Sequence, residues 1–89
     1  MITREVTIIN KLGLHARPSA MLVTTTSRFK SEVVLIKGDT EVNGKSIMGV
    51  MMLAAEKGSQ VKVQCDGPDE EAAMQAIVEV IESGFGEEI

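Results

Sequence analysis

The residue best suited to chemistry is His15, the only histidine of the chain, which lies in the segment NKLGLHARPSAML. Pro18 follows three residues later, and proline suits the first turn of a helix, where backbone N–H groups have no intrahelical partner. A lone histidine is more often a surface or packing residue than a reactive one. Here its place between a loop and a helix start keeps the ring out of the core and predicts that His15 is the helix N-cap.

The helix start next to His15 is expected to bind an anion. The backbone N–H groups of Ala16 and Arg17 are predicted to point out of the helix towards the ring, at the positive end of the helix dipole. The guanidinium of Arg17 adds a planar set of donors that matches phosphoryl oxygens. This positive environment disfavours the imidazolium and is expected to keep His15 neutral and nucleophilic. The pattern therefore favours a phosphoryl group carried on the imidazole, and not a metal.

Other kinds of reactive site have weaker support in the sequence. Cys65 has no basic neighbour and falls on the inward face of an expected strand, so we interpret it as an inert core thiol. The acidic pairs Glu70–Glu71 and Glu87–Glu88 are interpreted as a solvated helix start and a solvated tail. The sequence contains no cluster of metal ligands and no glycine-rich nucleotide motif, so we expect no cofactor.

Length and composition limit the class of protein. The chain has 89 residues and a mass of 9.6 kDa, so we expect one domain over residues 1–89. Its net charge of −4 and its low aromatic content of 2% argue against nucleic acid as a partner. No apolar run is long enough to span a membrane, the N-terminus lacks the features of a signal peptide, and a single cysteine fits a reducing compartment. We therefore expect a cytoplasmic protein.

Apolar periodicity and turn residues predict the elements that must position His15. Strands are expected at 2–9, 32–37, 40–42 and 60–65, and helices at 16–27, 47–55 and 70–83. The order β-α-β-β-α-β-α predicts an α+β domain in which helices cover one face of a four-stranded sheet. Ser46 and Asp69 are predicted to cap the second and third helices.

Two segments of the chain resemble the signatures of a known family. GLHARPS and KSIMGVMMLAAEKG, at residues 13–19 and 45–58, are similar to those of the HPr family, the histidine-containing phosphocarriers of the phosphoenolpyruvate-dependent phosphotransferase system. The resemblance covers essentially the whole chain. It implies an open-faced β-sandwich, in which three helices cover one face of a four-stranded antiparallel sheet.

The resemblance also implies a reaction at His15. Phospho-enzyme I passes its phosphoryl group to Nδ1 of the matching histidine, which transfers the group to a IIA domain. Arg17 matches the arginine of the family that stabilises the phosphoryl group. On this basis the chain is a phosphoryl-group carrier rather than a stand-alone enzyme. We expect Arg28 and Lys45 to be the other positive charges near the site.

The second segment carries two further expectations. Ser46 matches a serine that an ATP-dependent HPr kinase phosphorylates in some lineages, while its simpler role is that of a helix cap. Val50 and Leu53 are the better candidates for the buried side of the short helix, which leaves its other apolar residues more exposed. The resemblance implies a partner-docking patch made of Ala20, Ile47, Met48 and Met51.

The pathway that the carrier serves stays open. The opening ITREVTIINKLGLHARP and the ending CDGPDEEAAMQAIVEVIESGFGEEI resemble the nitrogen-related branch of the family, whereas KSIMGVMML resembles the sugar-pathway and kinase-regulated members. We expect a monomer whose partners are enzyme I, IIA domains and, if Ser46 is regulatory, an HPr kinase/phosphorylase. The alternatives are a regulatory docking protein and a small-ligand module similar to an ACT domain, which leaves GLHARP unexplained.

Overall fold

The computed structural model describes residues 1–89. The strands are β1 (Ile2–Thr7), β2 (Glu32–Lys37), β3 (Thr40–Asn43) and β4 (Gln60–Asp66), and the helices are α1 (Ala16–Thr26), α2 (Ile47–Met52) and α3 (Glu70–Glu82). A short 3-10 turn, η1 (Gly84–Gly86), follows α3. The predicted order of strands and helices is therefore confirmed, and η1 is an addition to it.

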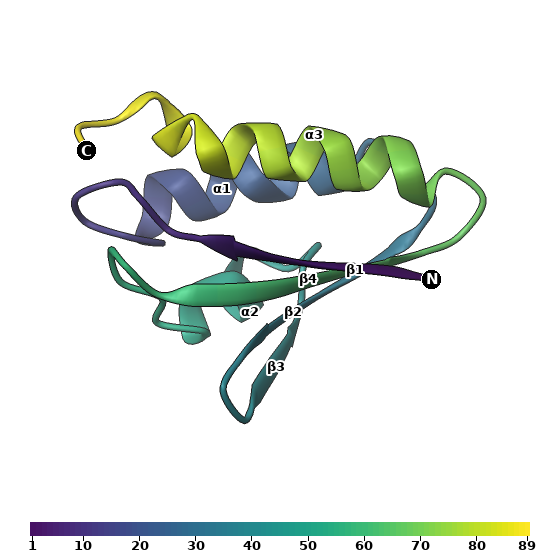
Figure 1. The fold of residues 1–89 in the computed structure, drawn as a ribbon, viewed down its shortest axis with the longest axis horizontal. Coiled ribbons are helices and arrows are strands. Elements are labelled where there is room, and N and C mark those ends of the chain that lie inside the picture. Colours follow the sequence, from purple (N-terminus) through teal and green to yellow (C-terminus); the bar gives the residue numbers. More distant parts are fainter.

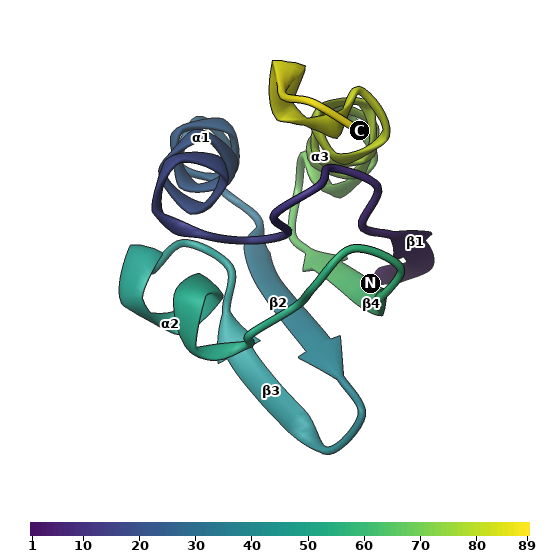
Figure 2. The same ribbon diagram turned by 90° about the vertical axis from the view of Figure 1, so that its left-hand side faces the viewer.

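The four strands form one antiparallel sheet in the order β1-β4-β2-β3. Helices α1 and α3 pack side by side over one face of this sheet, and α2 lies against α1 and β3 (Figures 1 and 2). The opposite face has no helix on it (Figure 2). This architecture is the predicted open-faced β-sandwich. None of its helices has the length and the apolar character needed to cross a membrane.

The core lies between the sheet and the helices and follows from the alternation of side chains along the strands. Val33 and Leu35 of β2 are buried, as are Val61 and Val63 of β4. They belong to a single cluster of 18 buried apolar residues that also includes Phe85 of η1. Burying one large apolar side chain contributes about 1.5–3 kcal/mol. Phe85 therefore fastens the C-terminal segment to the core.

The end of α2 is joined to the loop that carries His15. Helix α2 ends at Met52 rather than near Ala55, because Ala54 adopts a left-handed φ of 53° that turns the chain back. The carbonyl of Ala55 then accepts a hydrogen bond of 2.8 Å from the Leu14 N–H. The prediction that this helix runs to about Ala55 was thus wrong at its C-terminal end. Ala55 lies outside the helix and instead holds the loop before His15 through its hydrogen bond with Leu14.

Asp69 has a different role from the one predicted. It precedes α3, but its side chain does not cap that helix. Its carboxylate instead accepts hydrogen bonds from the backbone N–H groups of Lys30 (2.8 Å) and Ser31 (2.9 Å) and from the Ser31 hydroxyl. Asp69 therefore ties the start of α3 to the loop between α1 and β2.

We expect Asp69→Asn to destabilise the chain at neutral pH and to have a smaller effect in acid. The hydrogen bonds from the Ser31 hydroxyl and the Lys30 N–H lower the pKa of the Asp69 carboxyl from 3.8 to about 2. Because the pKa is lower in the folded state, the stabilisation is complete above about pH 4 and is lost as the pH falls towards about 2. The Tm difference between wild type and variant, followed by circular dichroism, should shrink over that range.

The matched control is Asp39→Asn, since Asp39 lies exposed in the turn between β2 and β3 and has no such hydrogen bonds. We expect this variant to have nearly the wild-type Tm at every pH. A Tm difference for Asp69→Asn that stays constant from neutral to acid pH would contradict the role of its ionised carboxylate.

Candidate functional site

His15 is the N-cap residue of α1, as predicted. Its φ of −79° and ψ of −169° are extended, and its side chain makes no cap hydrogen bond. The ring is therefore free for other contacts, with 37% of the side chain exposed. Ala16 and Arg17 are the first exposed residues of the helix, and their backbone N–H groups have no hydrogen-bond acceptor in the protein. The helix start thus presents two free donors beside the ring, at the positive end of its dipole.

Pro18 is buried in the first turn of α1. Proline fits there because the N–H groups of the first turn have no intrahelical partner, so the missing N–H costs no hydrogen bond. The next residue, Ser19, donates its backbone N–H to the His15 carbonyl (3.0 Å) and its hydroxyl to the Leu14 carbonyl (3.1 Å). These bonds begin the regular helix and fix the direction of the chain at His15.

A hollow of about 380 Å³ opens next to His15. Its walls carry the cations of Lys11 and Arg17 and the carboxylates of Glu87 and Glu88. Lys11 forms an ion pair with Glu88 at 3.6 Å, whereas Arg17 has no carboxylate within 4.0 Å. Of the two cations, Arg17 is therefore the one whose charge is not already paired.

Glu87 contradicts the interpretation of the acidic pair Glu87–Glu88 as a solvated tail. The Glu87 side chain is only 16% exposed, and its Oε1 lies 3.0 Å from Nε2 of His15. The same oxygen accepts a hydrogen bond of 3.1 Å from Nδ2 of Asn10. The environment of the imidazole is thus less positive than predicted, because a carboxylate lies on its Nε2 side.

The contact with His15 changes the pKa of the Glu87 carboxyl. The hydrogen bond with His15 lowers its pKa below the ordinary 4.5, and the Asn10 amide and the charge of Arg17 act in the same direction. Glu87 is consequently ionised at neutral pH. An ionised carboxylate only accepts hydrogen bonds, so Nε2 of His15 must be the donor.

The loop before His15 is held by Asn10 and Gly13. Asn10 is fully buried, and its Nδ2 also donates to the Gly13 carbonyl at 2.7 Å. Gly13 has a φ of +68°, and a Cβ atom there would lie 2.4 Å from the Ala55 oxygen. Only glycine therefore fits at this point, so the glycine of GLHARPS is required by the close approach to Ala55 as well as by the turn.

Ser46 caps α2, as predicted, because its Oγ accepts a hydrogen bond of 3.0 Å from the Gly49 N–H. The Thr26 hydroxyl at the end of α1 donates to the Gly44 carbonyl at 2.8 Å, so α2 begins where α1 ends. The start of α2 is therefore separated from His15 by the 11 residues of α1, a length of roughly 16 Å.

The same arrangement corrects the expected set of positive charges. Lys45 donates its ammonium to the Phe29 carbonyl at 2.7 Å, and the Arg28 guanidinium lies over the Phe29 ring, 5.5 Å from its centre. Both cations are at the C-terminal end of α1, away from His15. Arg17 is the one of the three expected cations that the fold brings to the ring.

The short helix α2 presents an apolar surface. Val50 and Leu53 are buried, as predicted. The exposed apolar residues of this surface, with their exposed fractions, are Ile47 (43%), Met48 (70%), Met51 (40%) and Met52 (72%). Ala20 on α1 is half-buried. The predicted exposure of the first three is confirmed, and Met52 is an exposed neighbour that the helical spacing did not single out.

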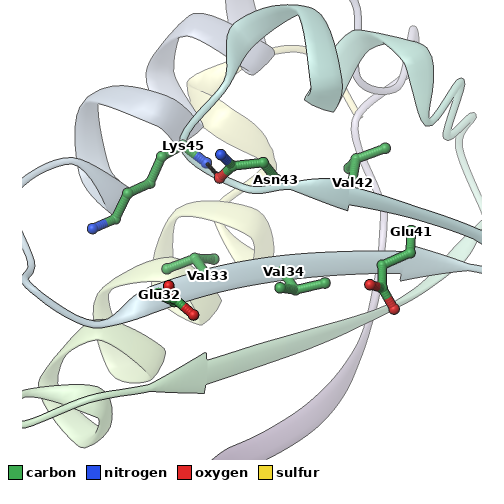
Figure 3. Close-up of a pocket in the computed structure, with 7 residues that line it drawn as sticks. All are labelled: Glu32, Val33, Val34, Glu41, Val42, Asn43 and Lys45. Atoms are coloured by element: carbon green, nitrogen blue, oxygen red, sulfur yellow. Dashed lines mark hydrogen bonds between the residues drawn. The ribbon is translucent and has the colours of Figure 1, made fainter.

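A second hollow, of about 480 Å³, lies over β2 and β3 (Figure 3). Its charged groups are Glu32, Glu41 and Lys45, and none of its lining residues is a histidine, cysteine or serine. Cys65 is fully buried in the core. The structure contains no group of three side chains able to hold a metal ion. The half-exposed imidazole of His15 thus lies next to a hollow with an unpaired cation.

Comparison with known proteins decides the family. Residues 2–83 match the family model described as the PTS HPr component phosphorylation site. The chain belongs to the HPr family. The family resemblance of GLHARPS and KSIMGVMMLAAEKG is therefore confirmed, and with it the description of the chain as an HPr-type phosphocarrier of the phosphotransferase system.

Individual HPr proteins are similar over their whole length. A phosphocarrier protein HPr from Neisseria meningitidis serogroup A is 54% identical over 87 residues, which cover 98% of each chain. That of Xylella fastidiosa strain Temecula1 is 52% identical over 88 residues, 99% of each chain. The crystal structure of HPr-C-His from Thermoanaerobacter tengcongensis is 48% identical, covers 100% of both chains and has a TM-score of 0.96.

Proposed function

We propose that the chain accepts a phosphoryl group from phospho-enzyme I on His15 and passes it to IIA domains. The observation that carries this proposal is the geometry of the helix start. The half-exposed ring of His15 lies beside the free N–H groups of Ala16 and Arg17 and the unpaired guanidinium of Arg17. The family supports the donor and acceptor classes, because HPr proteins are carriers of the phosphotransferase system.

Each group at the helix start has a role in this transfer. The lone pair of a ring nitrogen of His15 forms the N–P bond while the bond between phosphorus and phospho-enzyme I breaks, and the donor atom of enzyme I leaves with the electron pair. The two backbone N–H groups and the Arg17 guanidinium donate to the phosphoryl oxygens. A hydrogen bond to a charged group contributes about 1.5–3 kcal/mol, so these donors hold the group without a metal.

Incubation with phosphoenolpyruvate and enzyme I tests the proposal. We expect the wild-type chain to gain a phosphate that is labile in acid and stable in alkali, and to lose it when a IIA domain is added. Enzyme I must first be shown to phosphorylate a known HPr. If such an enzyme I leaves this chain unlabelled, the proposed carrier function is wrong.

We further propose that partners dock on the apolar surface of α2, beside the half-buried Ala20 of α1. Met48 and Met51 are exposed there, and methionine is flexible and polarizable, which suits a surface that meets several partners. This surface lies along the side of α1, so a partner bound to it reaches the His15 end of that helix.

Met48→Asp is expected to abolish phosphoryl transfer from enzyme I and to leave Tm nearly unchanged. Met48 is 70% exposed, and a carboxylate in the first turn of a helix is favourable, so the fold should tolerate it. Uptake of phosphate and the thermal unfolding curve are the two measurements. Met48→Leu is the control and should keep transfer. If the Met48→Asp variant accepts phosphate as wild type does, Met48 is not part of the docking surface.

Ser46 is proposed as a regulatory site that acts in addition to the carrier function. A phosphate there would place negative charge at the start of α2, next to the docking surface and a helix length from His15. We therefore expect phosphorylation by an HPr kinase/phosphorylase to weaken partner docking and not the chemistry of the ring.

The surroundings of the carrier are part of the same proposal. We propose a cytoplasmic, single-domain protein, which fits the reduced, buried Cys65. An HPr from Thermoanaerobacter tengcongensis that is 50% identical has been solved as a dimer, with a TM-score of 0.79. The monomer expected for this chain thus stays a prediction, which light scattering can check.

A further inference from the structure

The contact between Glu87 and His15 joins residues 72 positions apart in the sequence. Oε1 of Glu87 lies 3.0 Å from Nε2 of the ring, on the edge of the hollow next to the helix start. Because the carboxylate only accepts, the proton of a neutral imidazole is held on Nε2. Nδ1 then keeps its lone pair and is the nucleophilic nitrogen.

Glu87 is held in place independently of His15. Asn10, which is fully buried, donates Nδ2 to the same Glu87 oxygen at 3.1 Å. The Lys11 N–H donates to the Glu88 carbonyl at 2.7 Å, and the Glu87 N–H donates to the Gly84 carbonyl at 3.0 Å. Phe85, two residues earlier, is 1% exposed and packs in the core. The carboxylate is therefore a fixed group of the site and not part of a loose tail.

We propose that Glu87 is a positioning residue for phosphoryl transfer, whose carboxylate holds the proton on Nε2 of His15 and directs the phosphoryl group to Nδ1. The proposal rests on the proposed function, because it assigns a role in the reaction of His15. It adds a residue and a reason for the choice of ring nitrogen, which spacing and motif could not supply.

The step is balanced without a proton leaving the ring. The Nδ1 lone pair forms the N–P bond as the bond between phosphorus and phospho-enzyme I breaks, and the donor atom of enzyme I leaves with the electron pair. The ring keeps its proton on Nε2 and becomes cationic, and the Glu87 carboxylate offsets this charge. In the onward transfer the electron pair of the N–P bond returns to Nδ1, and the ring is neutral again. Loss of the carboxylate should therefore slow the loading of the ring.

A purely structural role for Glu87, as a tie between the C-terminal segment and Asn10, makes a different prediction. It would alter Tm but neither the tautomer of His15 nor the rate of loading. Glu87→Gln keeps the shape of the side chain and removes its charge. Glu88→Gln is the matched control, since Glu88 lies next in sequence with 77% of its side chain exposed and pairs only with Lys11.

The experiment combines imidazole ¹⁵N NMR of the unphosphorylated chain with the rate of phosphate uptake from phospho-enzyme I. Wild type and Glu88→Gln should show mainly the Nε2–H tautomer. Glu87→Gln should show a mixture of tautomers and load about 10- to 100-fold more slowly, which is the effect of losing one hydrogen bond to a charged group. Glu87→Asp keeps the charge and should restore part of both the tautomer preference and the rate.

The two proposals fail in different ways. If wild type is loaded and Glu87→Gln has the same tautomers and the same rate, the role of Glu87 is overturned and the carrier function stands. If wild type takes up no phosphate, the proposed function is overturned and the role of Glu87 falls with it. A change of Tm alone, with tautomers and rate unchanged, also overturns the proposal.

Discussion

His15→Ala should abolish the uptake of phosphate from phosphoenolpyruvate and enzyme I and leave the fold intact. His15 is the only histidine of the chain, and Cys65 is fully buried. The other nitrogen-bearing side chains of the hollow, Lys11 and Arg17, are cations without a free lone pair, so only His15 offers a nitrogen that can form the N–P bond. The His15 side chain makes no cap hydrogen bond, and Glu87 keeps its hydrogen bond from Asn10 when the ring is removed, so the loss of the contact with Glu87 should lower Tm without unfolding the chain. Labelling and thermal unfolding, measured on the same preparation, separate these two effects.

The control for this prediction is Ser46→Ala. Ser46 lies at the other end of α1 and should play no part in loading by enzyme I, so this variant should take up phosphate as wild type does. Label that persists in His15→Ala would show that another residue accepts the group. Label that is lost in Ser46→Ala at an unchanged Tm would show that the hydroxyl of Ser46 takes part in loading, beyond its role as the cap of α2.

Gly13→Ala should strongly destabilise the fold next to the site. The φ of +68° at Gly13 is unfavourable for alanine, at a cost of about 1–2 kcal/mol. The added Cβ would also lie 2.4 Å from the Ala55 oxygen and 2.8 Å from Cα of Glu56, and forced overpacking costs about 1–3 kcal/mol more. The free energy of unfolding, measured in urea, should fall by about 2–5 kcal/mol.

Gly38→Ala separates the two contributions. Gly38 has a similar φ of +58°, but an added Cβ there meets no atom within 4 Å. Its substitution should therefore cost only the backbone contribution, about 1–2 kcal/mol. Equal destabilisation by the two variants would show that the close approach of Gly13 to Ala55 does not matter for stability.

The part of the site that could be predicted from the sequence depends on residues close together in the chain. A loop followed by Pro18 places His15 at a helix start, and the free amides of Ala16 and Arg17 follow from helix geometry. Helical spacing likewise separates the buried Val50 from the exposed Met48. These features need no knowledge of distant contacts.

The part that could not be predicted depends on contacts across the fold. The two glutamates at 87 and 88 look alike in sequence, and only the anchoring of Phe85 in the core brings the first of them to His15. In the same way the position of Asp69 predicts a helix cap, but its carboxylate accepts a hydrogen bond from the backbone N–H of Ser31, 38 residues earlier in the chain. One local feature points to this anchoring. Phe85 lies between Gly84 and Gly86, and a large apolar residue between two glycines indicates a turn whose side chain is buried.

The position of the phosphoryl group tests the central claim most directly. A ¹⁵N-labelled chain, phosphorylated by phosphoenolpyruvate and enzyme I, can be examined by NMR for coupling between ³¹P and the imidazole nitrogens. We expect phosphorus to be bonded to Nδ1 of His15 and Nε2 to keep its proton beside Glu87. Phosphorus bonded to Nε2, or to any residue other than His15, would contradict it.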